Sequence, residues 1–289
     1  MLELENKENR SNHVDYDKIL AERRIDTAKI IEKPPIILSI KEVSPSGVSM
    51  KRIFTLGNFS TIIGKSKSRK TFLQSLFLAA IIKGSDYHEI LKGELPENKK
   101  LCIYIDTEQG QWDSYNTIKR IEKMAGIKDN FIAYNLRIYE PLERCNIIEH
   151  IFKIQGDKIG FCVIDGIADL AFGINDENEA TRIASMLLRL SRNCHISIVI
   201  HQNKNDNFAT GHLGSSVMKK SEIVISVNKF DKDKSCSEVK CDFNRGPDFE
   251  PFLIRINSYG YPEIAELRKT FPAKQNYYEV EKEQDMPPF

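Results

Sequence analysis

The segment that most constrains the chain is FSTIIGKSKSRKTF at residues 59–72, in which a short apolar run breaks at a glycine before a long apolar segment begins. The pattern predicts a strand, a loop and a helix in succession. Gly64, Lys70 and Thr71 have the spacing of a loop whose backbone N–H groups, lysine and hydroxyl together bind a nucleotide phosphate and Mg²⁺. The pattern reads G-x-x-x-x-R-K-T, with Arg69 where a second glycine normally allows the backbone to approach the phosphate.

We expect the cofactor-binding residues to be Gly64, Lys65, Ser66, Lys67, Ser68, Arg69, Lys70 and Thr71. The alternative is a basic turn, capped by Ser66 or Ser68, that precedes a buried helix without binding a ligand. If the loop binds ATP, the Arg69 side chain must point away from the backbone cradle. It would then reach a phosphate oxygen or an acidic group on a neighbouring subunit.

The composition is that of a globular chain, since 41% of the 289 residues are hydrophobic. Lys and Arg number 42 against 41 Asp and Glu, so any contact with nucleic acid must come from a local patch. The first ten residues are polar, and no run reaches the roughly 18 apolar residues of a membrane helix, so we expect a cytoplasmic protein with no membrane partner. The six cysteines are scattered without a C-x-x-C pair, which argues against a zinc site and against a disulfide framework.

Apolar runs and helical stripes alternate along most of the chain. We expect an arm over residues 1–34 that is partly helical, over 15–31, or disordered, one α/β domain over residues 35–257, and a tail over residues 258–289. The expected strands are 36–40 and 51–56 at an edge, then 59–64, 101–106, 135–139, 159–165, 196–203, 222–227, 237–243 and 252–256. The expected helices are 72–82, 113–126 with Asp113 as cap, 143–154, 177–194 and 214–220. Such alternation predicts a mostly parallel sheet covered by helices on both faces, with ligand sites at the carboxyl ends of the strands.

Polar residues stand at those strand ends. The apolar run at residues 161–164 ends in Asp165, which fits an acidic position in a Mg²⁺ shell. Gly166 follows it where many ATPases carry a water-activating glutamate, so we expect Glu108, at the end of another strand, to serve as the base. The alternative for Glu108 is a solvated acid that stabilises a helix start.

These motifs together resemble a family. Residues Gly64–Thr71, Ile105–Glu108, Val163–Asp165 and His201–Lys204, with the G-x-x-G-S-S stretch at 211–216, are similar to those of the RepA-like P-loop ATPases and helicases of plasmids and mobile genetic elements. The resemblance covers about residues 35 to 257. It implies an α/β, RecA-like P-loop NTPase fold with a mostly parallel central sheet flanked by helices.

The resemblance also implies a role for each matching residue. Lys70 would contact the β and γ phosphates, Thr71 and Asp165 would bind Mg²⁺, and Glu108 would orient the attacking water. His201 or Gln202 would sense the γ phosphate, although a core imidazole is the alternative for His201. Arg245 would reach the nucleotide of a neighbouring subunit, with a surface hairpin turn as the alternative.

The function that follows is an ATP-hydrolysing motor, such as a helicase, that acts on single-stranded DNA as a homo-oligomer. It would serve replication or mobilisation of a plasmid or transposon, together with proteins of that element. Lys204, Lys219 and Lys220 would face the DNA, or would form only a solvated basic face. One rival is a nucleotide-binding regulator with little hydrolysis, which Arg69 favours. The other is a small-molecule kinase, which the glutamate-bearing strand before Asp165 disfavours.

Overall fold

The computed structural model describes residues 14–44, 47–126, 129–203 and 208–267, and the chain forms two units, Met1–Lys33 and Pro34–Phe289. In the first unit, helix α1 (Tyr16–Arg23) begins after Asp15, whose side chain accepts a hydrogen bond from the backbone N–H of Lys18. None of the eight residues of this described helix is buried. The helical pattern expected over residues 15–31 is therefore wrong in its second half, because no tertiary packing supports a longer helix there.

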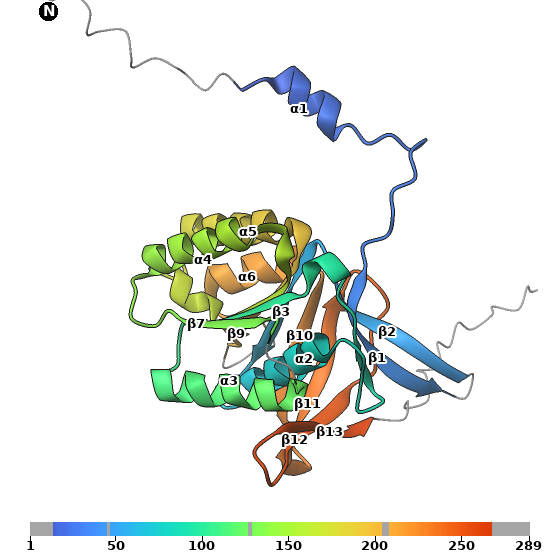
Figure 1. The fold of residues 1–289 in the computed structure, drawn as a ribbon. Coiled ribbons are helices and arrows are strands. Elements are labelled where there is room, and N and C mark those ends of the chain that lie inside the picture. The colour runs from blue at the N-terminus through green and yellow to red at the C-terminus, as the bar shows by residue number, and fades with distance from the viewer. Residues whose placement is uncertain (1–13, 45–46, 127–128, 204–207, 268–289) are drawn as a thin grey trace, which may run out of the picture. The chain divides into compact units, whose positions relative to one another are not determined.

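The second unit is built on a nine-stranded sheet with the order β13-β12-β11-β10-β3-β9-β8-β6-β7 (Figure 1). The six strands from β10 to β7 in this order are parallel to their neighbours, while β11, β12 and β13 are antiparallel additions. The bounds are β3 (Asn58–Gly64), β6 (Leu101–Asp106), β7 (Phe131–Asn135), β8 (Ile159–Asp165), β9 (His195–His201), β10 (Ile223–Phe230), β11 (Asp233–Asn244), β12 (Phe252–Ile256) and β13 (Pro262–Leu267). The mostly parallel α/β sheet expected from the sequence is confirmed.

Helices cover both faces of this sheet. In Figure 1, α2 and α3 lie on one face, and α4, α5 and α6 lie on the other. Their bounds are α2 (Lys70–Lys83), α3 (Gln111–Ala125), α4 (Pro141–Gln155), α5 (Glu177–Leu190) and α6 (Gly211–Lys220), and short 3₁₀ turns are η1 (Glu97–Lys99), η2 (Gly156–Lys158), η3 (Ile167–Leu170) and η4 (Ser191–Asn193). None of the helices in the described ranges is long and apolar enough to cross a membrane.

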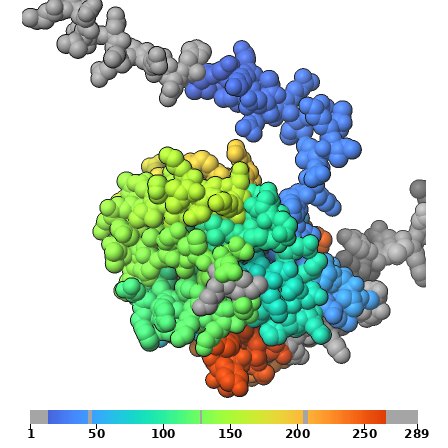
Figure 2. All heavy atoms as spheres, in the orientation of Figure 1, coloured from blue at the N-terminus to red at the C-terminus, as the bar shows by residue number. Residues whose placement is uncertain are grey.

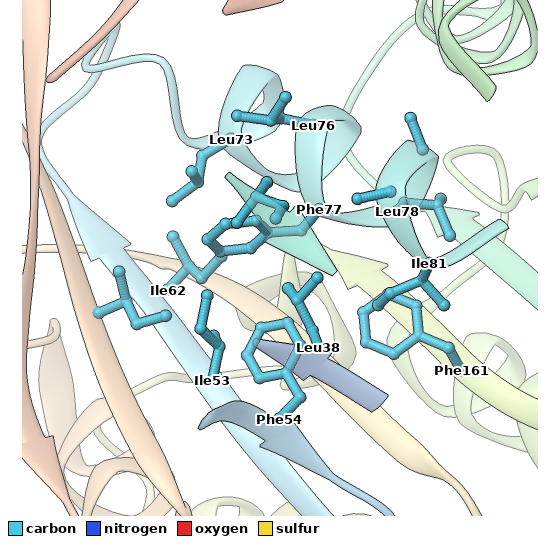
Figure 3. Packing of buried hydrophobic residues seen from close by; sticks show 14 of the residues in the cluster. Leu38, Ile53, Phe54, Ile62, Leu73, Leu76, Phe77, Leu78, Ile81 and Phe161 are labelled. Carbon is cyan, nitrogen blue, oxygen red and sulfur yellow. The ribbon is translucent and has the colours of Figure 1, made fainter. Parts of the chain in front are cut away.

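A cluster of buried hydrophobic side chains lies beneath α2 (Figure 3). Phe54 contacts Phe77 edge-on at 5.6 Å between ring centroids and stacks on Phe161 at 5.7 Å. All three rings are fully buried, and they join α2, β8 and a strand outside the central sheet. Because α2 is apolar almost all round, it is held on several sides, which fixes its first turn in place.

That outside strand belongs to a second, four-stranded antiparallel sheet with the order β2-β1-β5-β4. Its strands are β1 (Ile36–Ser44), β2 (Gly47–Thr55), β4 (Asp86–Tyr87) and β5 (Leu91–Gly93). We expected β1 and β2 at an edge of the main sheet, but β1 pairs with β5 from the turn-rich stretch after α2. The approach of β5 to α2 requires a glycine, because a Cβ on Gly93 would lie 2.1 Å from the carbonyl oxygen of Ala80.

Three further boundaries differ from the expectation. Strand β7 ends at Asn135, where we expected a strand to begin, because Asn135 pairs with Asp106 at the carboxyl end of β6. Helix α3 has Gly110 as its N-cap rather than Asp113, which lies in the first turn. Strand β13 lies within residues 258–289, which we expected to be a tail, and pairs with β12.

Candidate nucleotide-binding site

The loop between β3 and α2, which we expected to bind phosphate, closes tightly on Gly64. A Cβ on Gly64 would lie 2.3 Å from the carbonyl oxygen of Val227 and 2.5 Å from Ser68 Oγ, so only glycine fits. Ser68 Oγ is buried and has no hydrogen-bond partner among the described residues. The N-cap of α2 is Arg69, with no side-chain cap bond in this described stretch, so neither Ser66 nor Ser68 caps the helix. Ligand binding by the loop stays a prediction.

Arg69 takes the left-handed backbone conformation that the missing glycine would take, with φ at +77°. As expected, its side chain points away from the loop backbone, and within the chain it reaches β11. Its Nη1 donates to Ser237 Oγ at 2.7 Å and its Nη2 donates to the carbonyl oxygen of Lys234 at 3.2 Å. The guanidinium is thus attached to β11 of its own chain, while the residue still lines the cavity described below.

Lys70, the first residue of α2, turns its ammonium back over the loop. Its Nζ donates to the carbonyl oxygens of Gly64 at 2.9 Å and Lys65 at 3.1 Å, and lies 3.3 Å from His201 Nδ1. Burial lowers the pKa of Lys70, while the carboxylates of Asp165 and Glu108 act against that shift. A desolvated ammonium in this position is suited to bind an anion.

His201 connects Lys70 to the expected base. His201 Nδ1 faces the Lys70 ammonium, which can only donate, and His201 Nε2 lies 3.8 Å from Glu108 Oε1. The imidazole beside it lowers the pKa of Glu108 below its usual value, with burial acting in the opposite direction. The His201 side chain is 46% exposed, so the alternative of a core imidazole is wrong for His201; the buried imidazole on β9 is that of His195.

Thr71 and Asp165, the two residues that we expected to bind a metal, lie in contact with each other. Thr71 Oγ1 donates to Asp165 Oδ2 at 2.8 Å, so a hydroxyl and a carboxylate stand side by side at the start of α2 and the end of β8. These are hard oxygen ligands of the kind that Mg²⁺ binds together with phosphate oxygens, so the residues fit that ion. Burial raises the pKa of Asp165 to about 6.

Tyr104, on β6, is a site residue that the sequence did not indicate. Its hydroxyl donates to the same Asp165 Oδ2 at 2.8 Å, and its ring is fully buried. Burial is also the main cause that raises the pKa of Tyr104 well above its ordinary value. The only sequence signal was a tyrosine inside an otherwise apolar strand, which reads as core.

Asp106 is the second residue whose role sequence reasoning missed. Its Oδ1 accepts from the backbone N–H groups of Glu108 and Gln109 at 3.0 and 2.9 Å, and its Oδ2 accepts from Ser114 Oγ. Asn135 Nδ2 donates to the carbonyl oxygen of Gln109 at 2.9 Å and also to Ser114 Oγ. The aspartate at the end of β6 therefore fixes the loop that carries Glu108, in the manner of an Asx turn.

Most of the expected site residues line one cavity of about 530 Å³, which we call the site cavity, whereas Tyr104 and Asp106 support it from behind. Its lining includes the phosphate loop from Ser66 to Phe72, Glu108, Asp165 and His201, together with residues of α3, namely Asp113, Asn116, Thr117 and Arg120. Arg120 stacks over the Phe72 ring at 4.2 Å, donates to Ser75 Oγ and Thr117 Oγ1, and has a buried Nε with no partner in the described part of the chain. The polar stripe of α3 at helical spacing is the signal that could have predicted this wall.

Comparison with solved structures identifies the fold. The RadB recombinase matches with a TM-score of 0.50 and 16% identity over 72% of this chain and 91% of that chain. A second solved structure, itself an ATPase domain, matches with a TM-score of 0.53 and 13% identity over 73% of this chain and 85% of that chain. The fold is RecA-like. No protein-family profile and no curated protein matches the sequence, so the RepA-like branch stays a prediction.

The remaining expected residues of this RecA-like domain lie outside the site cavity. Gln202 is buried, and its backbone N–H donates to the carbonyl oxygen of Gly64 at 3.1 Å. Arg245 follows β11 and its Nη2 donates to the carbonyl oxygen of Lys220 at 3.0 Å, beside a separate cavity of about 410 Å³. Within the chain Arg245 thus has the geometry of a surface turn, and its action across an interface stays a prediction.

The lysines expected to face DNA lie near that second cavity where they are described. Lys219 and Lys220 form the basic last turn of α6, and Lys219 lines the 410 Å³ cavity. Lys204 falls outside the described residues.

Proposed function

We propose that this chain is an ATPase that binds Mg²⁺–ATP in the site cavity and acts on DNA. The observation that supports this most is the meeting of three chemistries in one cavity. Lys70 offers a cation for phosphate, the pair of Thr71 and Asp165 offers a metal site, and Glu108 offers a base. A cavity of about 530 Å³ is of the size that small-molecule ligands use.

Phosphate binding rests on the loop and on Lys70. The backbone N–H groups at the start of α2 and the partial positive charge of the helix N-terminus favour an anion above the loop. Lys70 would exchange its bonds to the carbonyl oxygens of Gly64 and Lys65 for bonds to phosphate oxygens. Mg²⁺ at Thr71 and Asp165 would neutralise charge on the phosphates.

Hydrolysis rests on Glu108. Asp106 and Ser114 hold its backbone in position, and its lowered pKa keeps the carboxylate ionised at neutral pH, ready to accept a proton from water. His201 lies between Glu108 and Lys70, so a phosphate that binds Lys70 would change the contact between Lys70 and His201 and, through His201, the position of Glu108. This is how His201 would sense the γ phosphate.

The finer parts of the proposal come from similarity. A RecA-like fold shared with a protein named as a recombinase is the reason to propose DNA as the polymer on which the ATPase acts. The motifs that resemble RepA-like proteins are the reason to propose a homo-oligomer in the replication or mobilisation of a plasmid or transposon, with Arg245 acting between subunits. The rival is a nucleotide-binding regulator with little hydrolysis, which the strained Arg69 at the helix start favours.

The test measures ATP affinity by calorimetry and phosphate release for the full chain and three variants. Lys70→Ala should lose ATP binding, and Glu108→Gln should keep binding and lose at least about a hundredfold in turnover, as for loss of a general base. Lys158→Ala, at the amino end of β8, removes an exposed lysine far from the loop along the strand and should change neither. ATP affinity unaffected by Lys70→Ala would refute the phosphate site, and turnover absent from wild type with intact binding would favour the regulator.

A further inference from the structure

Helix α3 has a second exposed side, beside the side that lines the site cavity and turned away from the buried side with Ser114, Ile121 and Ala125. Trp112, Tyr115, Lys119 and Lys123 recur at intervals of three and four residues, which places them on one face of the helix. Trp112 is 72% exposed and Tyr115 is 53% exposed. The helix lies on the outside of the domain in Figure 1, and its green atoms reach the surface in Figure 2. We call these four residues the outer face of α3.

The side chains of the outer face are ordered against one another. The rings of Trp112 and Tyr115 stack with centroids 5.8 Å apart and an interplanar angle of 26°, and Lys119 Nζ lies 5.6 Å from the Tyr115 ring centroid. Two large aromatic side chains exposed to water on a helix indicate a binding surface more than a packing role. The acid of the same helix turn, Asp113, lies instead in the lining of the site cavity.

We propose that the outer face of α3 binds single-stranded nucleic acid, with a base stacked on Trp112 and backbone phosphates bound by Lys119 and Lys123. Aromatic side chains that stack bases, next to cations that bind the backbone, are the combination that holds single strands without sequence preference. The charges at this spacing favour one partner: Lys119 and Lys123 outnumber Glu122, the acid that follows Tyr115 by seven residues, so the face complements a polyanion and disfavours a basic protein surface. This inference rests on the proposed function and places one nucleic-acid contact away from α6.

The same helix connects this face to the catalytic loop. Ser114, between the two aromatic residues, donates to Asp106, and Asp106 holds the backbone of Glu108. Asn116, Thr117 and Arg120 of α3 line the site cavity. Single-stranded nucleic acid bound on the outer face would therefore contact the helix that positions Glu108. Its addition should change the rate of ATP turnover.

Trp112 is the only tryptophan of the chain, so it reports directly on this surface. Titration of the full chain with oligothymidylate should quench its fluorescence, and oligouridylate should show whether ribose is accepted. With a labelled oligothymidylate and anisotropy as readout, Trp112→Ala should weaken binding by about tenfold, as for loss of one base stack. Lys119→Ala combined with Lys123→Ala should reduce the salt slope by about 1.4, for two phosphate contacts on a single strand.

Tyr259→Ala is the matched control, because Tyr259 is 81% exposed in the turn before β13 and lies outside the proposed surface. It should bind the oligonucleotide as wild type does. Unchanged oligonucleotide affinity in Trp112→Ala would overturn the inference. So would a Trp112→Ala variant that loses only ATP affinity, because the base of ATP would then lie on Trp112. Tryptophan quenching that depends on protein concentration without nucleic acid would also overturn it, because a second copy of the chain would then cover Trp112. Lys70→Ala separates this inference from the proposed ATP site, since it should still bind the oligonucleotide.

Discussion

Arg69 allows a direct test of the backbone conformation that replaces the second glycine of the phosphate loop. The residue has φ at +77°, and its guanidinium donates to Ser237 Oγ at 2.7 Å and to the carbonyl oxygen of Lys234 at 3.2 Å. Two substitutions separate these features. Arg69→Ala removes the hydrogen bonds and keeps the strain, whereas Arg69→Gly removes both.

The magnitudes predict an unusual order of stability. The left-handed conformation costs a non-glycine residue roughly 1–2 kcal/mol. The two partly exposed hydrogen bonds contribute about 1 kcal/mol together, at the low end of the range for ordinary hydrogen bonds because water screens the exposed guanidinium. Arg69→Ala should therefore lower the free energy of unfolding by about 1 kcal/mol. Arg69→Gly also loses the bonds but gains relief of strain, less roughly 0.5–1 kcal/mol of glycine backbone entropy, so it should lie close to wild type and above Arg69→Ala.

Urea unfolding of wild type and both variants measures this order. The control is Ser185, which is exposed in the middle of α5, because there the alanine variant should exceed the glycine variant by about 1 kcal/mol, as helix propensity dictates. The reasoning is refuted if alanine is as stable as glycine at position 69. ATP affinity of Arg69→Gly at low and high salt then shows whether the guanidinium charge also supports binding, since the variant keeps the backbone conformation and lacks the charge.

Two further predictions follow from the site and from its expected assembly. Because burial raises the pKa of Asp165 to about 6, the folded chain binds a proton more tightly than the unfolded chain, and stability should fall as pH rises from about 4 to 6. Without nucleotide, Asp165→Asn should then be more stable than wild type by up to about 3 kcal/mol at pH 8, and this gain should disappear near pH 4. Unfolding temperatures that are the same for the variant and wild type at both pH values would contradict this. If Arg245 acts across an interface, adding Arg245→Ala subunits to wild type should depress ATPase activity below the diluted value, whereas strictly proportional activity would favour a surface turn.

The sequence was sufficient for the strands that carry the site. Buried parallel strands such as β8 read as continuous apolar runs, and a polar residue at the end of each run marks the carboxyl edge of the sheet. For this reason the sequence alone predicts that Thr71, Glu108, Asp165 and His201 lie together around Lys70, and all five line the site cavity.

Elements that depend on tertiary contacts were not predictable in the same way. Strand β5 has three residues and exists because Gly93 lets it approach α2, which no periodicity reveals. Strand β7 is half-buried along its whole length, with only a four-residue apolar run, Phe131–Tyr134, and no alternation of buried and exposed positions, and we placed it four residues too late. The anchoring of Arg69 on Ser237 joins residues far apart in sequence, and local pattern carries no trace of it.

The charged groups of the site cavity are suited to an anionic ligand. Burial lowers the pKa of Lys70 and raises that of Asp165, because removal from water disfavours the charged form of each group. Lys65 and Lys67 add positive charge to the same loop. Phosphates bound with a divalent cation would add a charged partner to each group, an anion for Lys70 and a cation for Asp165, beyond the hydrogen bonds that each already makes. Binding would therefore offset part of the desolvation cost of these two charges. The free energy of unfolding should be higher with Mg²⁺ and nucleotide than without them.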